Sequence, residues 1–257
     1  WQNLLVKPEK GWEDKREAII GFDGKPTGKL RMTAQETADL LNSLIIRSKD
    51  LLEAHPYNKE KKEKGERMAN IIWPWGGGYR PSMKTLQEKY PQIKSGSCIS
   101  AVDLIKGIGK YAGLDVINVP RVTGLANTNY EGKVAAAINA LYNQDFVFVH
   151  FEASDEAGHD GNLDLKLKTI ENLDHRVVEP IYNEVKQWDE LVAIAVMPDH
   201  PTPVEIRTHV KEPIPFLVWH KGVKPDNVQV YDEESCVNGG YGMLHLTEFM
   251  DKFMSIQ

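Results

Sequence analysis

Apolar runs of strand length alternate with helical patterns from about residue 98 onward, and this alternation constrains the fold more than any other feature. LDVINV (114–119) is a predicted strand with two polar residues. The runs FVFVHF (146–151), LVAIAVM (191–197) and PFLVW (215–219) are almost wholly apolar, as strands buried on both faces are. Helical patterns separate the first three of these four segments, and the longest pattern has apolar residues on one face at Ile170, Leu173, Val177, Ile181 and Val185. The pattern predicts an α/β fold with a mostly parallel sheet and helices on both faces.

The stretch before residue 98 is irregular and polar, with one strong helical pattern. Residues Thr33 to Glu36 have the spacing of a capping box, so we expect a helix to begin there. The charged segment HPYNKEKKEKGER (55–67) is typical of a loop or a frayed helix end. The glycines and prolines of IIWPWGGGYRPSM (71–83) indicate a shaped loop.

The change of pattern near residue 98 predicts a domain boundary. Ser95, Ser97 and Ser100 are interpreted as a flexible joint between the two parts. We expect residues 1–97 to form a smaller α+β insert domain that binds substrate, and residues 98–257 to form an α/β core that binds metal.

Composition narrows the class of protein. The 257 residues carry a net charge of -6 without a basic stripe, which argues against a nucleic-acid partner. No apolar run reaches the roughly 18 residues of a membrane span. Cys98 and Cys236 lack a CxxC partner, so we expect a reducing, cytoplasmic compartment. The chain begins at Trp1 in a strand-like segment, and we interpret it as the C-terminal part of a longer protein; its oligomeric state is left open.

Aspartates and histidines follow the ends of the predicted strands. In an open α/β sheet, ligands gather at the carboxyl ends of strands. Carboxylate and imidazole groups are ligands for Mn²⁺, Zn²⁺, Co²⁺ or Mg²⁺. More such groups are present than one tetrahedral ion needs, so we expect two divalent ions, which can clamp the oxygens of a displacement at phosphorus. The candidate ligands are Asp155, His159, Asp199, His200 and His209.

The local sequence suggests how these ligands are arranged. We expect Gly158 to allow a sharp turn that brings Asp155 and His159 onto one ion. Because neighbouring residues point in different directions, the adjacent Asp199 and His200 favour bridging toward a second ion over chelating one. His150 is interpreted as a core histidine or a partner behind the ligands. Four other histidines are interpreted as structural: His55, His175, His220 and His245.

Three segments carry a resemblance to a known family. NIIWPWGGG (70–78), DFVFVHFEASDEAGHDG (145–161) and AVMPDHPTPVEIRTHVKEPIPFLVW (195–219) resemble the archaeal-type branch of the cofactor-independent phosphoglycerate mutases, within the alkaline phosphatase superfamily. The resemblance implies an alkaline-phosphatase-like fold. It also implies that one ion is held by Asp155, His159 and His209, and part of the other by Asp199 and His200.

The resemblance also implies a reaction. A phosphoryl group would pass from 3-phosphoglycerate to a serine and return to give 2-phosphoglycerate, a step of glycolysis and gluconeogenesis, with Mn²⁺ the expected ion. The family's nucleophilic serine and a further aspartate have no counterpart in this sequence, so the 257 residues are expected to lack the catalytic nucleophile and to be inactive alone. Expected substrate-binding cations are Arg207, Lys133, Arg80 and Arg121.

Two alternatives stay open. The same ligands suit a phosphatase, a phosphodiesterase or a phosphopentomutase on this scaffold. The 257 residues alone could also be a non-catalytic module that binds metal or substrate. A kinase is disfavoured because the sequence has neither a GxxxxGK[ST] nor a GxGxxG loop.

Overall fold

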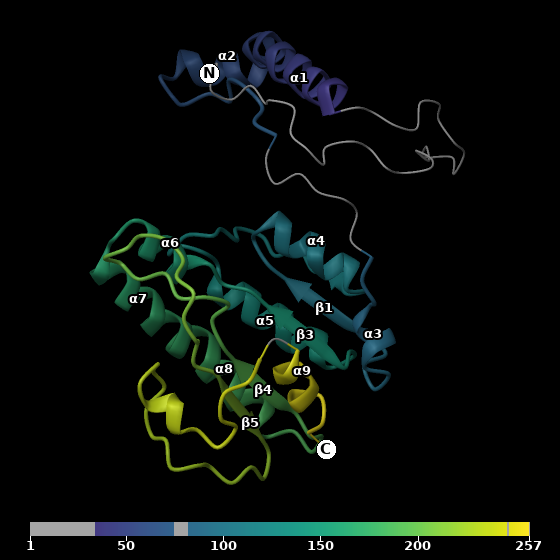
Figure 1. Ribbon diagram of the computed structural model, residues 1–257, viewed down its shortest axis with the longest axis vertical. Coiled ribbons are helices and arrows are strands. Elements are labelled where there is room, and N and C mark those ends of the chain that lie inside the picture. The colour runs from purple at the N-terminus through teal and green to yellow at the C-terminus, as the bar shows by residue number, and fades with distance from the viewer. Residues whose placement is uncertain (1–33, 75–81, 246, 257) are drawn as a thin grey trace. The chain divides into compact units, whose positions relative to one another are not determined.

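The computed structural model describes residues 34–74, 82–245 and 247–256. The chain divides at Arg80/Pro81 into two compact units (Figure 1). This division lies before the predicted boundary at residues 97/98, which falls inside a strand, Gly96–Ile99. The substrate-binding role of the first part stays a prediction.

The first unit contains two helices, α1 (Ala34–Ala54) and α2 (Pro56–Glu63). The charged segment predicted as a loop or a frayed end forms α2, because a proline at its first position and the His55 side chain at its N-cap favour a helical start. The buried Asn58 amide nitrogen donates to the carbonyl oxygens of Leu52 and Ala69, 2.7 Å each. Asn58 therefore ties α2 to the end of α1 and to the following segment.

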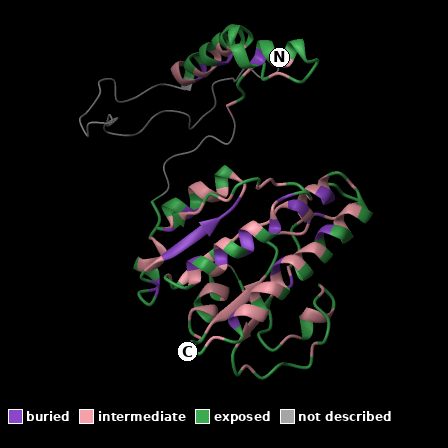
Figure 2. Ribbon diagram, turned by 180° about the vertical axis from the view of Figure 1, so that it is seen from behind, coloured by how far each residue is buried: buried purple, intermediate pink, exposed green. Residues whose placement is uncertain are grey.

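The second unit contains a parallel sheet in the order β2-β1-β3. Its strands are β1 (Gly96–Ile99), β2 (Asp115–Val116) and β3 (Phe146–Val149), with α4 (Asp103–Tyr111) and α5 (Tyr130–Leu141) in the connections. All residues of β1 are buried (Figure 2). The interpretation of the serines here as a flexible joint is therefore wrong: Ser97 lies within the central strand, opposite Val147 of β3.

A separate antiparallel pair is formed by β4 (Ala193–Val196) and β5 (Leu217–His220). The prediction of strands buried on both faces does not hold for β3 or β4, whose residues are only partly buried, with Phe148 42% exposed. Within the described residues, β3 and β4 each end a sheet, so each pairs with a strand along one edge only. The parallel arrangement is correct for β1, β2 and β3 and wrong for β4 and β5.

Helices α6 (Ala153–His159), α7 (Leu163–Leu173) and α8 (Glu179–Val185) follow β3 along the chain. The predicted long helix is present, but a π-helical segment, Asp174–Val178, interrupts it. There the Arg176 guanidinium lies 4.4 Å from the Tyr130 ring centroid and donates to both carboxylate oxygens of Glu131, at 2.6 and 2.9 Å. These contacts fasten the helix to α5, beside a core of Tyr130, Val134 and Val177.

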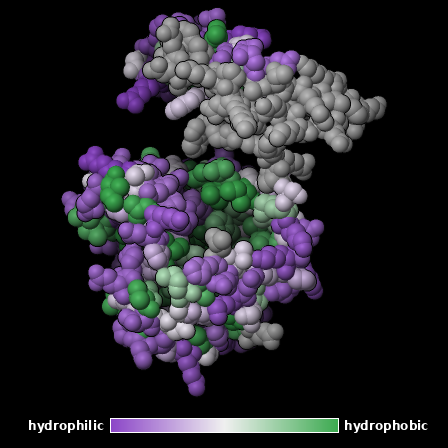
Figure 3. Space-filling view, in the orientation of Figure 1, coloured by the Kyte–Doolittle hydropathy of each residue, from purple (hydrophilic) through white to green (hydrophobic). Residues whose placement is uncertain are grey.

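The remaining elements are short: α3 (Leu86–Lys89), a 3₁₀ turn (Ser235–Asn238) and α9 (Glu248–Phe253). The visible surface of the second unit is largely hydrophilic, with hydrophobic side chains in separate patches (Figure 3). Scattered exposed hydrophobic residues of this kind are normal on a globular domain. Among the described residues, no helix is both long and apolar enough to cross a membrane.

Candidate metal centre

Helix α6 positions the first two candidate ligands. Asp155 and His159 are four residues apart and therefore lie on one face of the helix, with Asp155 Oδ2 3.4 Å from His159 Nε2. Ala153 and Ala157 on the opposite face are buried, and so is Gly158. The sharp turn predicted at Gly158 is thus replaced by a turn of helix. Glycine is needed there for a different reason: a Cβ would lie 2.4 Å from the carbonyl oxygen of Thr202.

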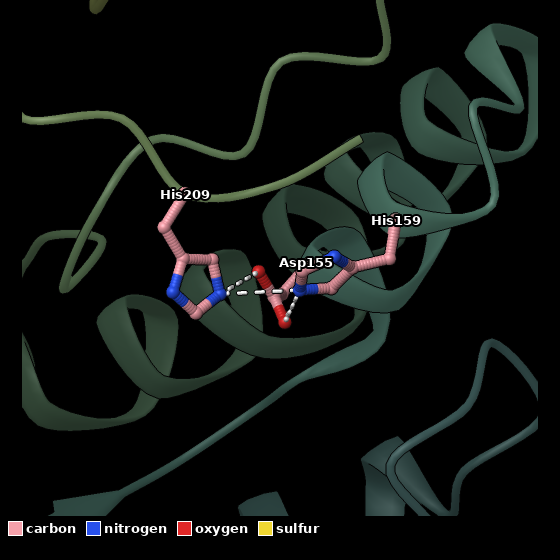
Figure 4. Close-up of side chains that lie close together, drawn as sticks. All are labelled: Asp155, His159 and His209. Carbon is pink, nitrogen blue, oxygen red and sulfur yellow. Dashed lines mark hydrogen bonds and ion pairs between the residues drawn. The ribbon is translucent and has the colours of Figure 1, made fainter. Parts of the chain in front are cut away.

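The loop after β4 returns the third ligand to the same place. The backbone N–H of Arg207 donates to Pro203 O at 2.9 Å, and that of Val210 donates to Pro201 O at 3.2 Å. This folded loop brings His209 Nε2 to 3.5 Å from Asp155 Oδ1 and 3.1 Å from His159 Nε2 (Figure 4). Its ring and that of His159 face the carboxylate from two sides (Figure 4).

These three donor atoms have the spacing of ligands around one ion. Tetrahedral ligands about 2.1 Å from a metal are about 3.4 Å from one another. In addition, His159 Nδ1 lies 3.0 Å from the carbonyl oxygen of Arg207, which can only accept. His159 therefore carries its proton on Nδ1 and presents a lone pair at Nε2, the arrangement that metal-binding histidines require. The chemistry and spacing of Asp155, His159 and His209 fit a divalent cation.

Asp199 and His200 form a second donor pair beside the first three. Asp199 Oδ2 lies 3.4 Å from His200 Nε2, so these neighbours converge instead of pointing apart as expected. The backbone N–H of His200 donates to Asp199 Oδ1 at 3.1 Å and turns the carboxylate back toward the ring. The His200 and His209 ring centroids are 3.6 Å apart. The five predicted ligands thus lie in one cluster, with three donors in one group and two in the other.

Two further acids surround Asp155, and sequence reasoning missed them. Glu152, Asp155 and Glu156 form a second group of converging oxygens. Burial raises the pKa of Glu152, and the nearby charges of Glu156 and Asp155 raise it further. The spacing of these acids at i, i+3 and i+4 in EASDE was the available signal, but it has meaning only once the segment is known to be helical.

A family model described as the Metalloenzyme superfamily matches residues 31–255 of the chain. The chain belongs to the metalloenzyme superfamily. Membership implies divalent metal ions, in keeping with the donor cluster.

Several similar proteins are named as phosphoglycerate mutases. The chain is 49% identical over 219 residues to the 2,3-bisphosphoglycerate-independent phosphoglycerate mutase of Methanosarcina acetivorans, covering 85% of this chain and 55% of the relative. It is 40% identical over 255 residues to mutase 2 of Methanothermobacter thermautotrophicus, covering 99% of this chain and 62% of the relative. The predicted resemblance to this family is confirmed. The chain spans little more than half the length of these relatives.

Solved structures agree on the fold. The PH0037 protein from Pyrococcus horikoshii superposes with a TM-score of 0.70 at 28% identity, covering 93% of this chain and 65% of that one. A cofactor-independent phosphoglycerate mutase from Thermoplasma acidophilum superposes with a TM-score of 0.51 at 26% identity, covering 90% and 53%. The predicted α/β fold class is confirmed.

The predicted substrate-binding arginines of this metalloenzyme lie in different settings. Arg207 is exposed beside the cluster, and its guanidinium packs over Gly161, where a Cβ would lie 2.3 Å from Arg207 Nε. Arg121 is exposed in the loop between β2 and α5. Both have positive φ angles, 58° for Arg207 and 59° for Arg121, a strained conformation that often marks functional loops. Arg80 lies outside the described residues.

Lys133, the fourth predicted cation, is buried in this member of the metalloenzyme superfamily. It is 1% exposed, its Nζ donates to the carbonyl oxygen of His150 at 2.8 Å, and Nζ lies 4.4 Å from the Phe151 ring centroid. Burial lowers the pKa of Lys133 to about 8, and the charge of Glu152 offsets part of this shift. The structure thus places Lys133 behind the end of β3 and not on an open surface.

His150 directly follows β3 and contacts Lys133 and Ser100. Its Nδ1 is 3.2 Å from the Ser100 hydroxyl, which also accepts the backbone N–H of Val102 at 3.0 Å. Burial lowers the pKa of His150, while the charge of Asp199 acts in the opposite direction. This half-buried, hydrogen-bonded setting suits either interpretation of His150, a core histidine or a partner behind the ligands, so its role stays a prediction.

Proposed function

We propose that the whole protein interconverts 3-phosphoglycerate and 2-phosphoglycerate through a phosphoserine, as a cytoplasmic step of glycolysis and gluconeogenesis. The observation that carries the proposal is the convergence of Asp155, His159 and His209 on one point with the spacing of metal ligands. The names of the relatives favour a mutase among the phosphotransfer reactions that such a centre supports.

Each donor group has a role in this proposal. Asp155, His159 and His209 would hold one divalent ion, and Asp199 with His200 would hold part of a second. Mn²⁺ is our first choice, because carboxylate and imidazole ligands together suit it. Such ions lower the pKa of a bound nucleophile and neutralise charge on the transferring oxygens. The resemblance assigns the nucleophilic serine and one more aspartate to sequence outside these 257 residues.

The cations of the chain would bind and orient the phosphoglycerate. Arg207 stands beside the cluster, where a guanidinium can grip a carboxylate or phosphate with two hydrogen bonds. Arg121 and Arg80 are further candidates for the same role. Lys133 would have to leave the His150 carbonyl to touch substrate; with a pKa of about 8 it is mostly protonated at pH 7 and could supply positive charge.

A coupled assay on the whole protein tests the proposal. With 3-phosphoglycerate and enolase present, we expect formation of phosphoenolpyruvate and little release of inorganic phosphate. We expect Asp155→Asn to abolish this activity, because it weakens the first ligand group. The mutase assignment would be overturned if inorganic phosphate were the main product.

A phosphatase is the second candidate, because the same ligands suit it. Within these 257 residues the side chains of Asp199 and His209 are 69% and 51% exposed, so in a mutase the rest of the protein or the substrate would have to cover the cluster. A mutase must exclude water from its phosphorylated intermediate. The ratio of phosphoenolpyruvate to free phosphate in the assay above separates the two functions.

A further inference from the structure

Thr202 is a buried residue in contact with two of the candidate ligands. It is 3% exposed and follows the Asp199-His200 pair by two residues. Its hydroxyl donates to Asp155 Oδ1 at 2.5 Å and lies 3.2 Å from His200 Nδ1. One side chain therefore touches a member of each donor group.

The hydrogen bonds of this hydroxyl fix the tautomer of His200. An ionised carboxylate only accepts hydrogen bonds, so the single hydroxyl proton of Thr202 is used on Asp155. The oxygen can then only accept from His200, whose proton must lie on Nδ1. His200 Nε2 is left with its lone pair, and this is the atom that lies 3.4 Å from Asp199 Oδ2. This lone pair faces the carboxylate of Asp199, the other member of the second donor pair.

The backbone of Thr202 is held from two sides. Lys166 Nζ of α7 donates to the Thr202 carbonyl oxygen at 2.5 Å. The same oxygen lies so close to α6 that only glycine fits at position 158. These contacts bind the loop after β4 to both helices after β3, so the position of the hydroxyl is set by the fold.

We propose that Thr202 is a positioning residue that couples the two donor groups, orienting the Asp155 carboxylate and setting the tautomer of His200. The inference rests on the proposed metal centre and adds a residue outside the ligand set. Partners behind metal ligands fix their orientation and raise metal affinity by about 10- to 100-fold. Thr202 thus has a role in ion binding although it would not contact the ion.

Mn²⁺ titration of the 257-residue chain, followed by calorimetry, tests this role with three variants. Thr202→Val keeps the shape of the side chain and removes the hydroxyl, and we expect it to weaken the tighter site about 10- to 100-fold. Thr202→Ser keeps the hydroxyl and should stay within about threefold of the unmodified chain. Thr208→Val makes the same change at an exposed position of the same loop and should have no effect. An unchanged affinity in Thr202→Val, or equal losses in the valine and serine variants, would overturn the proposal.

Nitrogen-15 NMR of the metal-free chain gives a second readout that needs no variant. We expect the neutral His200 ring to be protonated at Nδ1, and Thr202→Val to mix the tautomers. Protonation at Nε2 in the unmodified chain would contradict the proposal even if the variant failed to fold. Asp155→Asn separates the two levels of inference: if it leaves Mn²⁺ affinity unchanged, the metal centre itself is wrong. If only Thr202→Val has no effect, the coupling role alone is wrong.

Discussion

His159 Nε2 and His209 Nε2 lie 3.1 Å apart, although fifty positions of sequence separate them. His159 reaches this point from the end of α6, and His209 from a loop that folds back after β4. The carboxylate of Asp155 lies within 3.5 Å of both nitrogens. Histidine nitrogens from two separate segments meet at one carboxylate, and this meeting is the physical basis of the proposed metal centre.

Replacement of His209 by alanine should weaken Mn²⁺ binding by more than about 100-fold. This loss is larger than the one expected for Thr202→Val, which removes a partner of the ligands and not a ligand. The reason is that one of three converging donor atoms is removed while the helix carrying the other two is left intact. Isothermal titration calorimetry of the 257-residue chain measures the effect. His175→Ala is the matched control, since His175 is 70% exposed and pairs with Glu179 instead of the cluster. Equal affinities in the two variants would contradict the assignment of His209 as a ligand.

Gly158→Ala should destabilise the chain by about 1–3 kcal/mol, the usual range for overpacking. Alanine is the better helix former by up to about 1 kcal/mol, but its methyl group would meet the Thr202 carbonyl at 2.4 Å. Gly107→Ala is the control. Gly107 lies in α4, and a Cβ there would meet open space, so this substitution should stabilise the chain by about 0.5–1 kcal/mol. Urea unfolding measures both changes. Stabilisation of both variants would show that the close approach of Thr202 is absent.

The buried Lys133 should make stability depend on pH. Its pKa is about 8 in the folded chain against 10.5 for the free side chain, so the unfolded state binds more protons between these values. Stability should therefore rise with pH from about 8 to about 10.5, because the penalty for burying the charge is fully present below pH 8 and is relieved above it. The full shift corresponds to roughly 3 kcal/mol, as an upper estimate.

Lys133→Met removes this titration. The free energy of unfolding of the unmodified chain should therefore rise relative to that of Lys133→Met as pH rises through this window. Urea unfolding in the presence of a chelator, at about pH 7 and pH 9.5, measures the difference. Lys168→Met, at a 66% exposed position, should show no such trend. A difference that is constant with pH would mean that Lys133 is solvated.

Much of the candidate site could be predicted because its ligands stand in local motifs. Asp155, His159, Asp199 and His200 follow apolar runs, and chain order alone places them at strand ends. The helical setting of the first pair was missed, since Gly158 suggested a turn. The sequence pattern holds no sign that a carbonyl from a distant loop excludes every larger side chain there.

The features that sequence reasoning missed depend on contacts between distant segments. Ser95, Ser97 and Ser100 suggest a flexible joint, but Ser97 lies in β1, whose burial comes from pairing with β3 about fifty residues later. The role of Thr202 follows from contacts with Asp155 and Lys166, which no spacing reveals. The contact of Lys133 with the His150 carbonyl has no sign in the sequence either, while its role in substrate binding stays a prediction.

The central claim is that Asp155, His159 and His209 hold a divalent cation, and anomalous diffraction from crystals of the chain grown with Mn²⁺ tests it most directly. We predict an anomalous peak bonded to Asp155 and to Nε2 of both histidines, at about 2.0–2.3 Å. A peak bonded only to Glu152 and Glu156, or no peak at the cluster with Mn²⁺ in excess, would contradict the claim.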